Sequence, residues 1–376
     1  MSSGTKSPDP YHRHKLFHPY HLRRATALLD GEIPAPSTVE IDLTDGACNQ
    51  ACVHCCFGSG PHRKLRSIDA ERLLPFLAQA YAYGTRAFEL VGGGEPTNHA
   101  HVCEIIERIH RIGVDGGEPA CIGLVTNGVR MERIGSVASR LEWVRISLDA
   151  PDEATYNKLH GVREAQGHFA RVLGNIRMLH ARMDPSRVRL AYLVVPPINH
   201  QRDKIVAVAD LASECGVEHV AYRPAVVQYP TSPQDWWEAA TAIRYAKKRH
   251  GPAFVLGGSG GSWDHVLGIQ RHPTGAYRTK PLVMVIKADG TIPSCFLFRE
   301  RLRERPPIGN ITDGFSAVWF SERHRRSIDA VDRSACPTVC KNFRADAALD
   351  QLEAAGTDVG CVALISAADI DNPHFI

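Results

Sequence analysis

Short apolar segments rich in β-branched residues alternate with longer segments of helical periodicity between residues 38 and 228. The short segments predict strands, which we expect at residues 39–43, 87–91, 121–125, 143–148, 188–195 and 218–223. Between them, apolar residues recur at three- and four-residue spacing, which predicts helices, most clearly at residues 71–84, 101–113 and 170–183. Because strands that alternate with helices form parallel βαβ units, the pattern predicts an α/β fold with a partial (β/α)6 barrel of the TIM type.

The alternation ends near residue 228, where segments rich in proline, glycine and tryptophan follow. Further along, residues 283–294 (VMVIKADGTIPS) predict a β-hairpin with Asp289 and Gly290 in its turn. We therefore expect a C-terminal α+β extension after the barrel. The predicted parts are an N-terminal arm (1–37), the barrel (38–228), a connecting segment (229–280) and the C-terminal extension (281–376).

Composition narrows the class of protein. Of the 376 residues 44% are hydrophobic, which is enough for a substantial core, and the formal net charge of +3 gives no reason to expect nucleic acid as a partner. The chain has no apolar window of about eighteen residues and its N-terminus is polar and basic, so we expect neither a membrane partner nor a secretory signal. Eleven cysteines then favour metal ligation in a reducing compartment, and we expect a cytoplasmic location.

Three cysteines lie within eight residues, directly after the first predicted strand. They are Cys48, Cys52 and Cys55, spaced C-x3-C-x2-C in ACNQACVHCCFG. Three thiolates on one loop can hold three irons of a [4Fe–4S] cube and leave the fourth iron open for another ligand. Two alternatives stay open, a zinc site in which His54 joins the cysteines and a set of unliganded buried thiols. The position at the end of a barrel strand favours a functional site.

Three further motifs follow the next predicted strands in order. They are Gly92-Gly93-Gly94-Glu95-Pro96, Thr126-Asn127-Gly128 and Ser147-Leu148-Asp149. Glycines permit close approach of the backbone, and a carboxylate pairs with an ammonium group. Each motif taken singly also has a structural interpretation, because the first two are common as loops and turns and the third can cap a helix.

Together these motifs resemble those of radical S-adenosylmethionine (SAM) enzymes. The cysteines match that family's C-x3-C-x-φ-C motif with His54 at the φ position, and the three later motifs are similar to its GGEP, TNG and SLD elements. The resemblance implies that Cys48, Cys52 and Cys55 ligate a [4Fe–4S] cluster. It also implies that SAM is bound by His54, Gly92, Gly93, Gly94, Glu95, Asn127, Ser147 and Asp149.

One residue departs from the family pattern. His160, in YNKLHG, stands where related sequences often carry an arginine able to meet the SAM carboxylate. A protonated histidine can do part of that work. The other interpretation, which we favour from the sequence, is a solvated helix residue without a role in the site.

The C-terminal third resembles the SPASM or shorter twitch extension of the same family, which carries auxiliary iron–sulfur clusters. The similarity rests on Gly290-x4-Cys295, on the segment 308–321 and on Cys336-x3-Cys340. The family's upstream cysteine, about ten to sixteen residues before the glycine, is absent, and its later cysteine array is reduced. We expect one auxiliary cluster with the metal ligands Cys295, Cys336, Cys340 and Cys361.

Two further interpretations of these cysteines stay open. If Cys361 lies too far away to be a ligand, one iron of the auxiliary cluster stays open and is available to a substrate. In that case Cys361 is also the candidate hydrogen donor of the reaction. The alternative for the whole set is that these cysteines are core or incidental thiols.

The resemblance implies a reaction and its partners. The reduced cluster passes one electron to SAM, which gives methionine and a 5′-deoxyadenosyl radical, and the radical takes a hydrogen atom from an unactivated C–H bond. Electron loss to an auxiliary cluster makes the outcome an oxidation, such as a dehydrogenation, whereas hydrogen return from a thiol makes it an epimerisation. The implied partners are a small-molecule substrate and an electron donor such as flavodoxin or ferredoxin.

The resemblance says least about the class of substrate. Relatives with this extension modify ribosomal peptides or small metabolites, and the 37 residues before the barrel are too few for the leader-binding domain that peptide-modifying members often carry. We therefore expect a small polar metabolite of sugar, aminocyclitol or nucleoside type. Maturation of a ribosomally made peptide is the alternative. An iron–sulfur electron carrier or regulator that never cleaves SAM is the alternative of another class.

Overall fold

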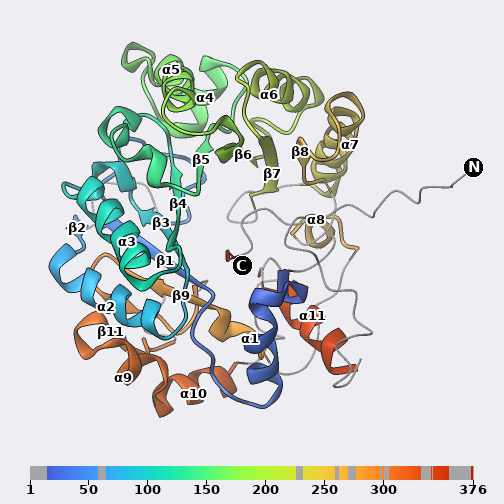
Figure 1. The fold of residues 1–376 in the computed structure, drawn as a ribbon. Helices are drawn as coiled ribbons and strands as arrows, with labels where there is room; N and C mark the ends of the chain where they lie inside the picture. The colour runs from blue at the N-terminus through green and yellow to red at the C-terminus, as the bar shows by residue number, and fades with distance from the viewer. Residues whose placement is uncertain are drawn as a thin grey trace, which may run out of the picture.

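A nine-stranded sheet, parallel except for one pair, forms the centre of the protein. Figure 1 shows the strands arranged around a central axis with the helices outside them. The strand order is β2-β1-β3-β4-β5-β6-β7-β8, and β9 also pairs with β1. This computed structural model describes residues 15–57, 65–225, 232–258, 262–269, 277–296, 305–331 and 342–354, with Arg299, Cys340, His374 and Phe375.

All six predicted strands are present. They are β1 (Thr38–Asp45), β3 (Ala87–Gly93), β4 (Cys121–Thr126), β5 (Trp143–Ser147), β6 (Val188–Val194) and β7 (His219–Pro224). Each pairs with the next in parallel, so the predicted α/β fold with a partial barrel is confirmed. Three short strands complete the sheet, namely β2 (Arg66–Ser67), β8 (Val255–Leu256) and β9 (Val283–Ile286).

Helices cover the outer face of this sheet (Figure 1). Their bounds are α2 (Ala70–Ala82), α3 (Val102–Gly116), α4 (Glu153–His160), α5 (His168–His180), α6 (Arg202–Glu214), α7 (Pro233–His250) and α8 (Ser262–Val266). The three predicted helices correspond to α2, α3 and α5. The N-cap of α2 follows a common rule, because the Asp69 side chain accepts a hydrogen bond from the backbone N–H of Glu71.

Alternation along the strands separates an apolar outer layer from a polar inner face. On β1 the residues Val39, Ile41 and Leu43 belong to the main hydrophobic core, so Glu40 and Asp42 point to the opposite face. The same alternation on β3, β5 and β7 turns polar and charged residues inward. These are Glu89, Arg145, His219 and Arg223.

A helix not predicted from the sequence lies before the barrel. The 3-10 helix η2 (Lys15–Phe17) and helix α1 (Pro19–Leu29) pack on helix α11 (Asn342–Ala354). The contact is a small apolar core formed by Leu16, Ala25, Leu28, Leu282, Ala345, Ala348, Leu349 and Leu352. Residues 15–29 of the expected arm are thus helical and pack against the C-terminal part of the chain.

The predicted hairpin forms its turn and one backbone hydrogen bond across it, from the Lys287 N–H to the Thr291 carbonyl over 2.9 Å, but no two-stranded ladder. Gly290 has the left-handed φ of 78°, and its N–H donates to the Lys287 carbonyl over 2.8 Å, which closes a tight turn. The strands on either side find different partners. Strand β9 pairs in parallel with β1, and β10 (Thr291–Ile292) pairs with β11 (Gly309–Asn310). The free edge of β1 takes up β9, so the first strand of the extension becomes part of the barrel sheet.

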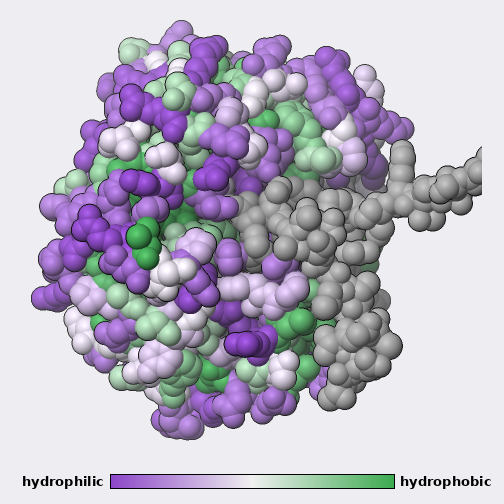
Figure 2. Space-filling view, in the orientation of Figure 1, coloured by the Kyte–Doolittle hydropathy of each residue, from purple (hydrophilic) through white to green (hydrophobic). Residues whose placement is uncertain are grey.

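Two further α-helices, α9 (Phe315–Trp319) and α10 (Glu322–Asp329), follow β11 and lie in the lower part of the molecule in Figure 1. Figure 2 shows hydrophilic residues spread over most of the described part of one face, with hydrophobic residues in smaller groups between them. Among the described helices, none combines the length and the apolar character that crossing a membrane requires.

Candidate active site

The cysteine loop leaves the carboxyl end of β1 and is held from two sides. On one side the Glu95 N–H donates to the Ala47 carbonyl over 2.9 Å. On the other, the N–H groups of Ala51 and Val53 donate to the carbonyls of His160 and Leu159, both over 2.9 Å. The backbone of the loop is therefore tied both to the glycine-rich motif after β3 and to the end of α4.

The three loop cysteines differ in exposure, and the thiols of Cys48 and Cys52 have raised pKa values. Cys48 is exposed, and Cys52 and Cys55 are half-buried. Although Cys48 is exposed as a residue, the surrounding protein partly desolvates its thiol and raises its pKa. Burial raises the pKa of Cys52 well above its usual range, and the charges of neighbouring cysteines add to both shifts. The free thiols of Cys48 and Cys52 therefore keep their protons at neutral pH, and thiolates at these positions would need a bound cation to stabilise their charge.

Polar groups around the loop are placed to donate to cysteine sulfurs. The Asn127 Nδ2 lies 3.9 Å from the Cys48 Sγ and donates to the Asn49 Oδ1 over 2.7 Å. The Asn127 Oδ1 accepts from the Val129 N–H over 3.0 Å, which fixes the orientation of the amide. Donors to cluster sulfurs influence the reduction potential of iron–sulfur clusters. Asn127, predicted as a SAM-binding residue, thus also links the third motif to the cysteine loop.

Glu95 is a buried carboxylate held by four hydrogen bonds. Its Oε1 accepts from the Thr97 N–H (3.0 Å), the Thr97 hydroxyl (2.7 Å) and the Thr126 hydroxyl (2.6 Å). Its Oε2 accepts from the Asn127 N–H alone among the described residues, over 2.8 Å. Burial raises the pKa of Glu95, and the four donors oppose that shift. The arrangement holds one carboxylate oxygen rigidly and leaves the other able to accept from a ligand.

Two of the glycines before Glu95 have no room for a side chain. A Cβ on Gly94 would lie 2.6 Å from the Ala47 carbonyl oxygen and 2.7 Å from the Thr44 Oγ1. A Cβ on Gly92 would lie 2.4 Å from the carbonyl oxygen of Gly94 itself. Any larger residue at position 94 would push the cysteine loop away from Glu95. The close approach that Gly94 permits is therefore, in this structure, an approach of the cysteine loop, whereas Gly92 permits the tight turn of its own motif.

Asp149 combines a strained backbone with a buried carboxyl group. It has a φ of 58°, and among the described residues no other residue besides glycine has a positive φ. The Asn199 amide donates to its carbonyl over 2.9 Å, and the Leu193 N–H donates to its Oδ1 over 2.6 Å. Burial raises the pKa of Asp149 to about 7. Such backbone strain costs about 1–3 kcal/mol and is typical of functional sites. Ser147, the other predicted residue of this motif, is the last residue of β5.

His160 is buried under the cysteine loop, so the expectation of a solvated residue is wrong. Its side chain is 1% exposed, its Nδ1 lies 3.1 Å from the Cys52 Sγ, and its Nε2 lies 3.2 Å from the Leu148 carbonyl oxygen. The cause is Gly161, whose φ of 59° ends α4 and where a Cβ would lie 2.5 Å from the Ala51 carbonyl oxygen. The loop rests on this glycine and covers the preceding histidine.

Two histidines face Asp149 from opposite elements. His54 Nε2 and His160 Nε2 lie 3.6 and 3.7 Å from the Asp149 Oδ2. Burial lowers the pKa of His54 to about 4 and that of His160 to about 3, so both rings are neutral around neutral pH. Together with Cys52 they place three metal-ligating atoms within 4.8 Å of one another, which keeps the zinc alternative testable.

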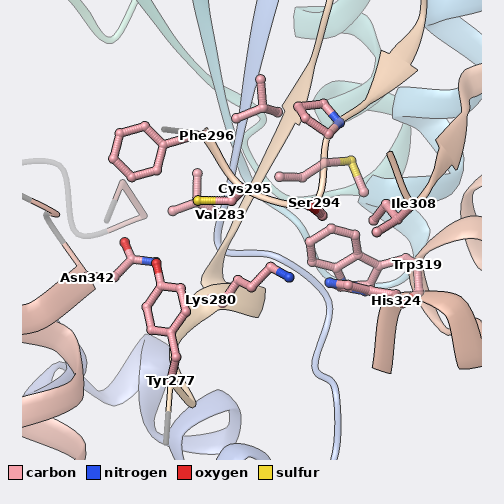
Figure 3. Close-up of a pocket in the computed structure, with 13 residues that line it drawn as sticks. Tyr277, Lys280, Val283, Ser294, Cys295, Phe296, Ile308, Trp319, His324 and Asn342 are labelled. Atoms are coloured by element: carbon pink, nitrogen blue, oxygen red, sulfur yellow. Dashed lines mark hydrogen bonds between the residues drawn. The ribbon is translucent and has the colours of Figure 1, made fainter. Parts of the chain in front are cut away.

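The second set of cysteines lies in the C-terminal extension and is described in part. Cys295 and Cys340 are both buried, and the Cys340 Sγ lies 3.4 Å from the Tyr277 hydroxyl. Cys336 and Cys361 lie outside the described residues. Figure 3 shows Cys295, Tyr277 and Asn342 around one pocket, with Trp319 and His324 on its other side. Tyr277 is not among the site residues predicted from the sequence, although it lies in the segment that lacks the family's cysteine.

A buried ion pair joins this extension to the inner face of the barrel. The Arg299 guanidinium pairs with the Asp42 carboxylate on β1, and it also lies over the Phe57 ring, 4.9 Å from its centroid. The Lys287 ammonium donates to the Arg299 carbonyl over 2.9 Å. Because Phe57 follows the cysteine loop, these contacts tie the extension to the neighbourhood of the loop.

Comparison with protein families matches two parts of the chain. A model of the radical SAM superfamily matches residues 45–212, and a model of an iron–sulfur cluster-binding domain, SPASM, matches residues 282–342. Curated GTP 3′,8-cyclases of Corynebacterium glutamicum are similar; that of strain R is 27% identical over 211 residues, which are 54% of this chain and 52% of the cyclase. The chain thus spans about half the length of the curated relatives it matches.

Solved structures share the fold over most of the chain. The structure of native anSMEcpe with bound AdoMet has a TM-score of 0.57 and 17% identity, and the match covers 82% of this chain and 87% of the other. The structure of native anSMEcpe with bound AdoMet and Cp18Cys peptide has the same TM-score of 0.57 and 17% identity, covering 82% and 86% of the two chains. At such identities the likeness concerns the fold.

Proposed function

Since this chain is a radical SAM enzyme with a C-terminal SPASM extension, we propose that it abstracts hydrogen from a small polar metabolite. A radical SAM domain carries a [4Fe–4S] cluster with SAM, and a SPASM extension carries auxiliary iron–sulfur clusters. When bound, the first cluster and SAM supply a 5′-deoxyadenosyl radical as the hydrogen-abstracting group. The proposed outcome is oxidation, in particular dehydrogenation, or epimerisation of the metabolite.

The proposed ligands of the first cluster are the three loop cysteines, and Glu95 is the proposed partner of the SAM ammonium group. The observation that carries this assignment is the Glu95 carboxylate, which is buried beside the cysteine loop and held by four donors. Its Oε2 retains an acceptor site for a cation. The other residues proposed to line the SAM site are His54, Gly92, Gly93, Gly94, Asn127, Ser147 and Asp149.

The inner face of the barrel supports a polar substrate. The Arg145 guanidinium nitrogen Nη2 lies 3.4 Å from the Glu89 Oε1. The positive charge of Arg145 is the main cause that lowers the pKa of Arg223 to about 10. The charges of Glu89 and Glu40 also act on Arg223, and its guanidinium is proposed to hydrogen-bond a ligand. Charged groups on this face suit hydroxyl, amino or phosphate groups of a metabolite. The two curated cyclases, named for a nucleotide, favour the nucleoside type within this class.

The choice between oxidation and epimerisation rests on the C-terminal cysteines. Cys295 and Cys340 are proposed ligands of an auxiliary cluster able to accept an electron, which favours oxidation. Cys336 and Cys361 complete the proposed set; if Cys361 is not a ligand, it is instead the proposed hydrogen donor of an epimerisation. The proposed electron source for the first cluster is a flavodoxin or ferredoxin.

Metal analysis and product analysis test this proposal. Anaerobically purified protein is expected to hold about four irons per chain for each cluster, and zinc without iron would refute the proposal. Reduced protein is expected to convert SAM to 5′-deoxyadenosine. Candidate sugars, aminocyclitols and nucleosides are then supplied in deuterated water. Solvent deuterium in the product indicates epimerisation, whereas loss of two hydrogens indicates oxidation.

A further inference from the structure

Tyr277 lies in the segment where related SPASM extensions carry an upstream cysteine that this chain lacks. It lies thirteen residues before Gly290, within the range where related SPASM extensions carry their upstream cysteine. The side chain is buried, with 4% of its surface exposed, and its hydroxyl lies 3.4 Å from the Cys340 Sγ. The charges of Cys340 and Cys295 both act on this phenol, so it lies close to both described cysteines of the extension.

The segment that carries Tyr277 is fixed on both faces. The Thr279 N–H and hydroxyl donate to the Asp346 carboxylate over 2.9 and 2.8 Å. The Arg278 guanidinium donates to Glu353 over 2.9 Å, and the Lys280 ammonium donates to the Ser327 carbonyl over 2.8 Å. Figure 3 shows Tyr277 pointing from this segment into the pocket that Cys295 and Asn342 also line. The hydroxyl therefore has a defined position relative to the sulfur.

The distance distinguishes a hydrogen bond from metal ligation. Each iron of a [4Fe–4S] cube takes one protein ligand, so two ligands of one cube sit on different irons, farther apart than hydrogen-bonding atoms. A phenol has an ordinary pKa of about 10 and keeps its proton at neutral pH, whereas an iron-bound cysteine is a thiolate without one. The two atoms lie 3.4 Å apart, so when Cys340 is bound to iron the Tyr277 O–H would be the donor and the Cys340 sulfur the acceptor.

We propose that Tyr277 tunes the auxiliary cluster by donating a hydrogen bond to the Cys340 sulfur, which raises the reduction potential of that cluster. The inference rests on the proposed assignment of Cys295 and Cys340 as cluster ligands. The physical reason is electrostatic, because the partial positive charge of the hydrogen stabilises the extra electron of the reduced state. Tyr277 is thus a positioning residue that acts through Cys340, and it replaces the family's cysteine by a donor rather than by another ligand.

The test compares Tyr277→Phe with Tyr245→Phe, a matched control on the exposed side of α7. Each substitution is made in the full chain that also carries Cys48→Ala, Cys52→Ala and Cys55→Ala, so that only the auxiliary cluster remains. Iron per chain is counted, and the reduction potential is measured by a titration followed by electron paramagnetic resonance. We expect unchanged iron and a lower potential in Tyr277→Phe, with both values unchanged in Tyr245→Phe.

Three outcomes would overturn the inference. An unchanged potential at unchanged iron would show that the O–H does not act on the sulfur. Loss of the iron in Tyr277→Phe alone would make Tyr277 a ligand. Absence of iron from the protein with the three loop substitutions would remove the auxiliary cluster, while 5′-deoxyadenosine formation by the wild type would still support the proposed function. If Tyr277→Phe does not fold, Tyr277→Met, which also lacks the hydroxyl, provides the same comparison.

Discussion

Replacing Glu95 by glutamine changes one atom in the most tightly hydrogen-bonded group of the site. Three donors point at Oε1, so the amide oxygen of Glu95→Gln retains most hydrogen bonds when it takes that position. The amide nitrogen then replaces Oε2 and faces the N–H of Asn127, which loses its acceptor. A buried donor without an acceptor costs about 1–3 kcal/mol, so we expect a lower melting temperature.

The same substitution removes the charge proposed to hold the SAM ammonium. Hydrogen bonds to charged groups contribute about 1.5–3 kcal/mol, and each 1.4 kcal/mol is about tenfold in affinity. We therefore expect Glu95→Gln to bind SAM about ten- to a hundredfold more weakly. The assay is calorimetric titration of SAM into cluster-loaded protein, with iron per chain measured on the same sample. Glu104→Gln, an exposed carboxylate on α3, serves as the matched control.

The reasoning is refuted if folded Glu95→Gln, with the iron content of the wild type, binds SAM within twofold of the wild type. Such a result would mean that the four donors hold Glu95 for packing between the loops alone. Loss of iron in Glu95→Gln but not in Glu104→Gln would instead show that Glu95 stabilises the cysteine loop.

Three further predictions concern packing and charge. Gly94→Ala places a Cβ 2.6 Å from the cysteine loop and is expected to lower iron per chain, whereas Gly174→Ala, with open space, is expected to leave it unchanged. Arg299→Leu breaks a buried ion pair and is expected to cost about 3–5 kcal/mol in chemical denaturation. Arg326→Leu removes an exposed pair and is expected to cost less than about 1 kcal/mol. Burial lowers the pKa of His324 from 6.5 to about 4, so the unfolded state binds a proton more readily than the folded state between these pH values. The free energy of unfolding is therefore expected to fall by about 3 kcal/mol as the pH falls from 6.5 to about 4. Thermal melts of His324→Asn over the same pH range should show a smaller decrease in melting temperature.

The strands were predictable because a strand with one buried face alternates apolar and polar residues. In β1 the residues Val39, Ile41 and Leu43 alternate with polar residues, and that alternation survives in the structure because the sheet has an apolar outer and a polar inner face. The order of motifs at successive strand ends also predicted their convergence, since parallel strands end at one edge. Glu95, Asn127 and the cysteine loop do meet there.

What the sequence missed depends on long-range partners. The hairpin prediction at residues 283–294 used local turn chemistry, and the turn at Gly290 formed, but the edge of β1, more than two hundred residues earlier, took β9 as its partner. The burial of His160 likewise depends on a loop packed against Gly161. A left-handed C-cap glycine after a helix is visible in the sequence, but the segment that rests on it is not.

The central claim is that the three-cysteine loop is the radical source. Reduced wild-type protein and Cys215→Ala, whose cysteine follows α6 away from the loop, are expected to convert SAM to 5′-deoxyadenosine, and Cys52→Ala is expected to produce none above the background of the assay. The measurement is the yield of 5′-deoxyadenosine per chain under strictly anaerobic reduction. Conversion by Cys52→Ala at the rate of Cys215→Ala would contradict the account.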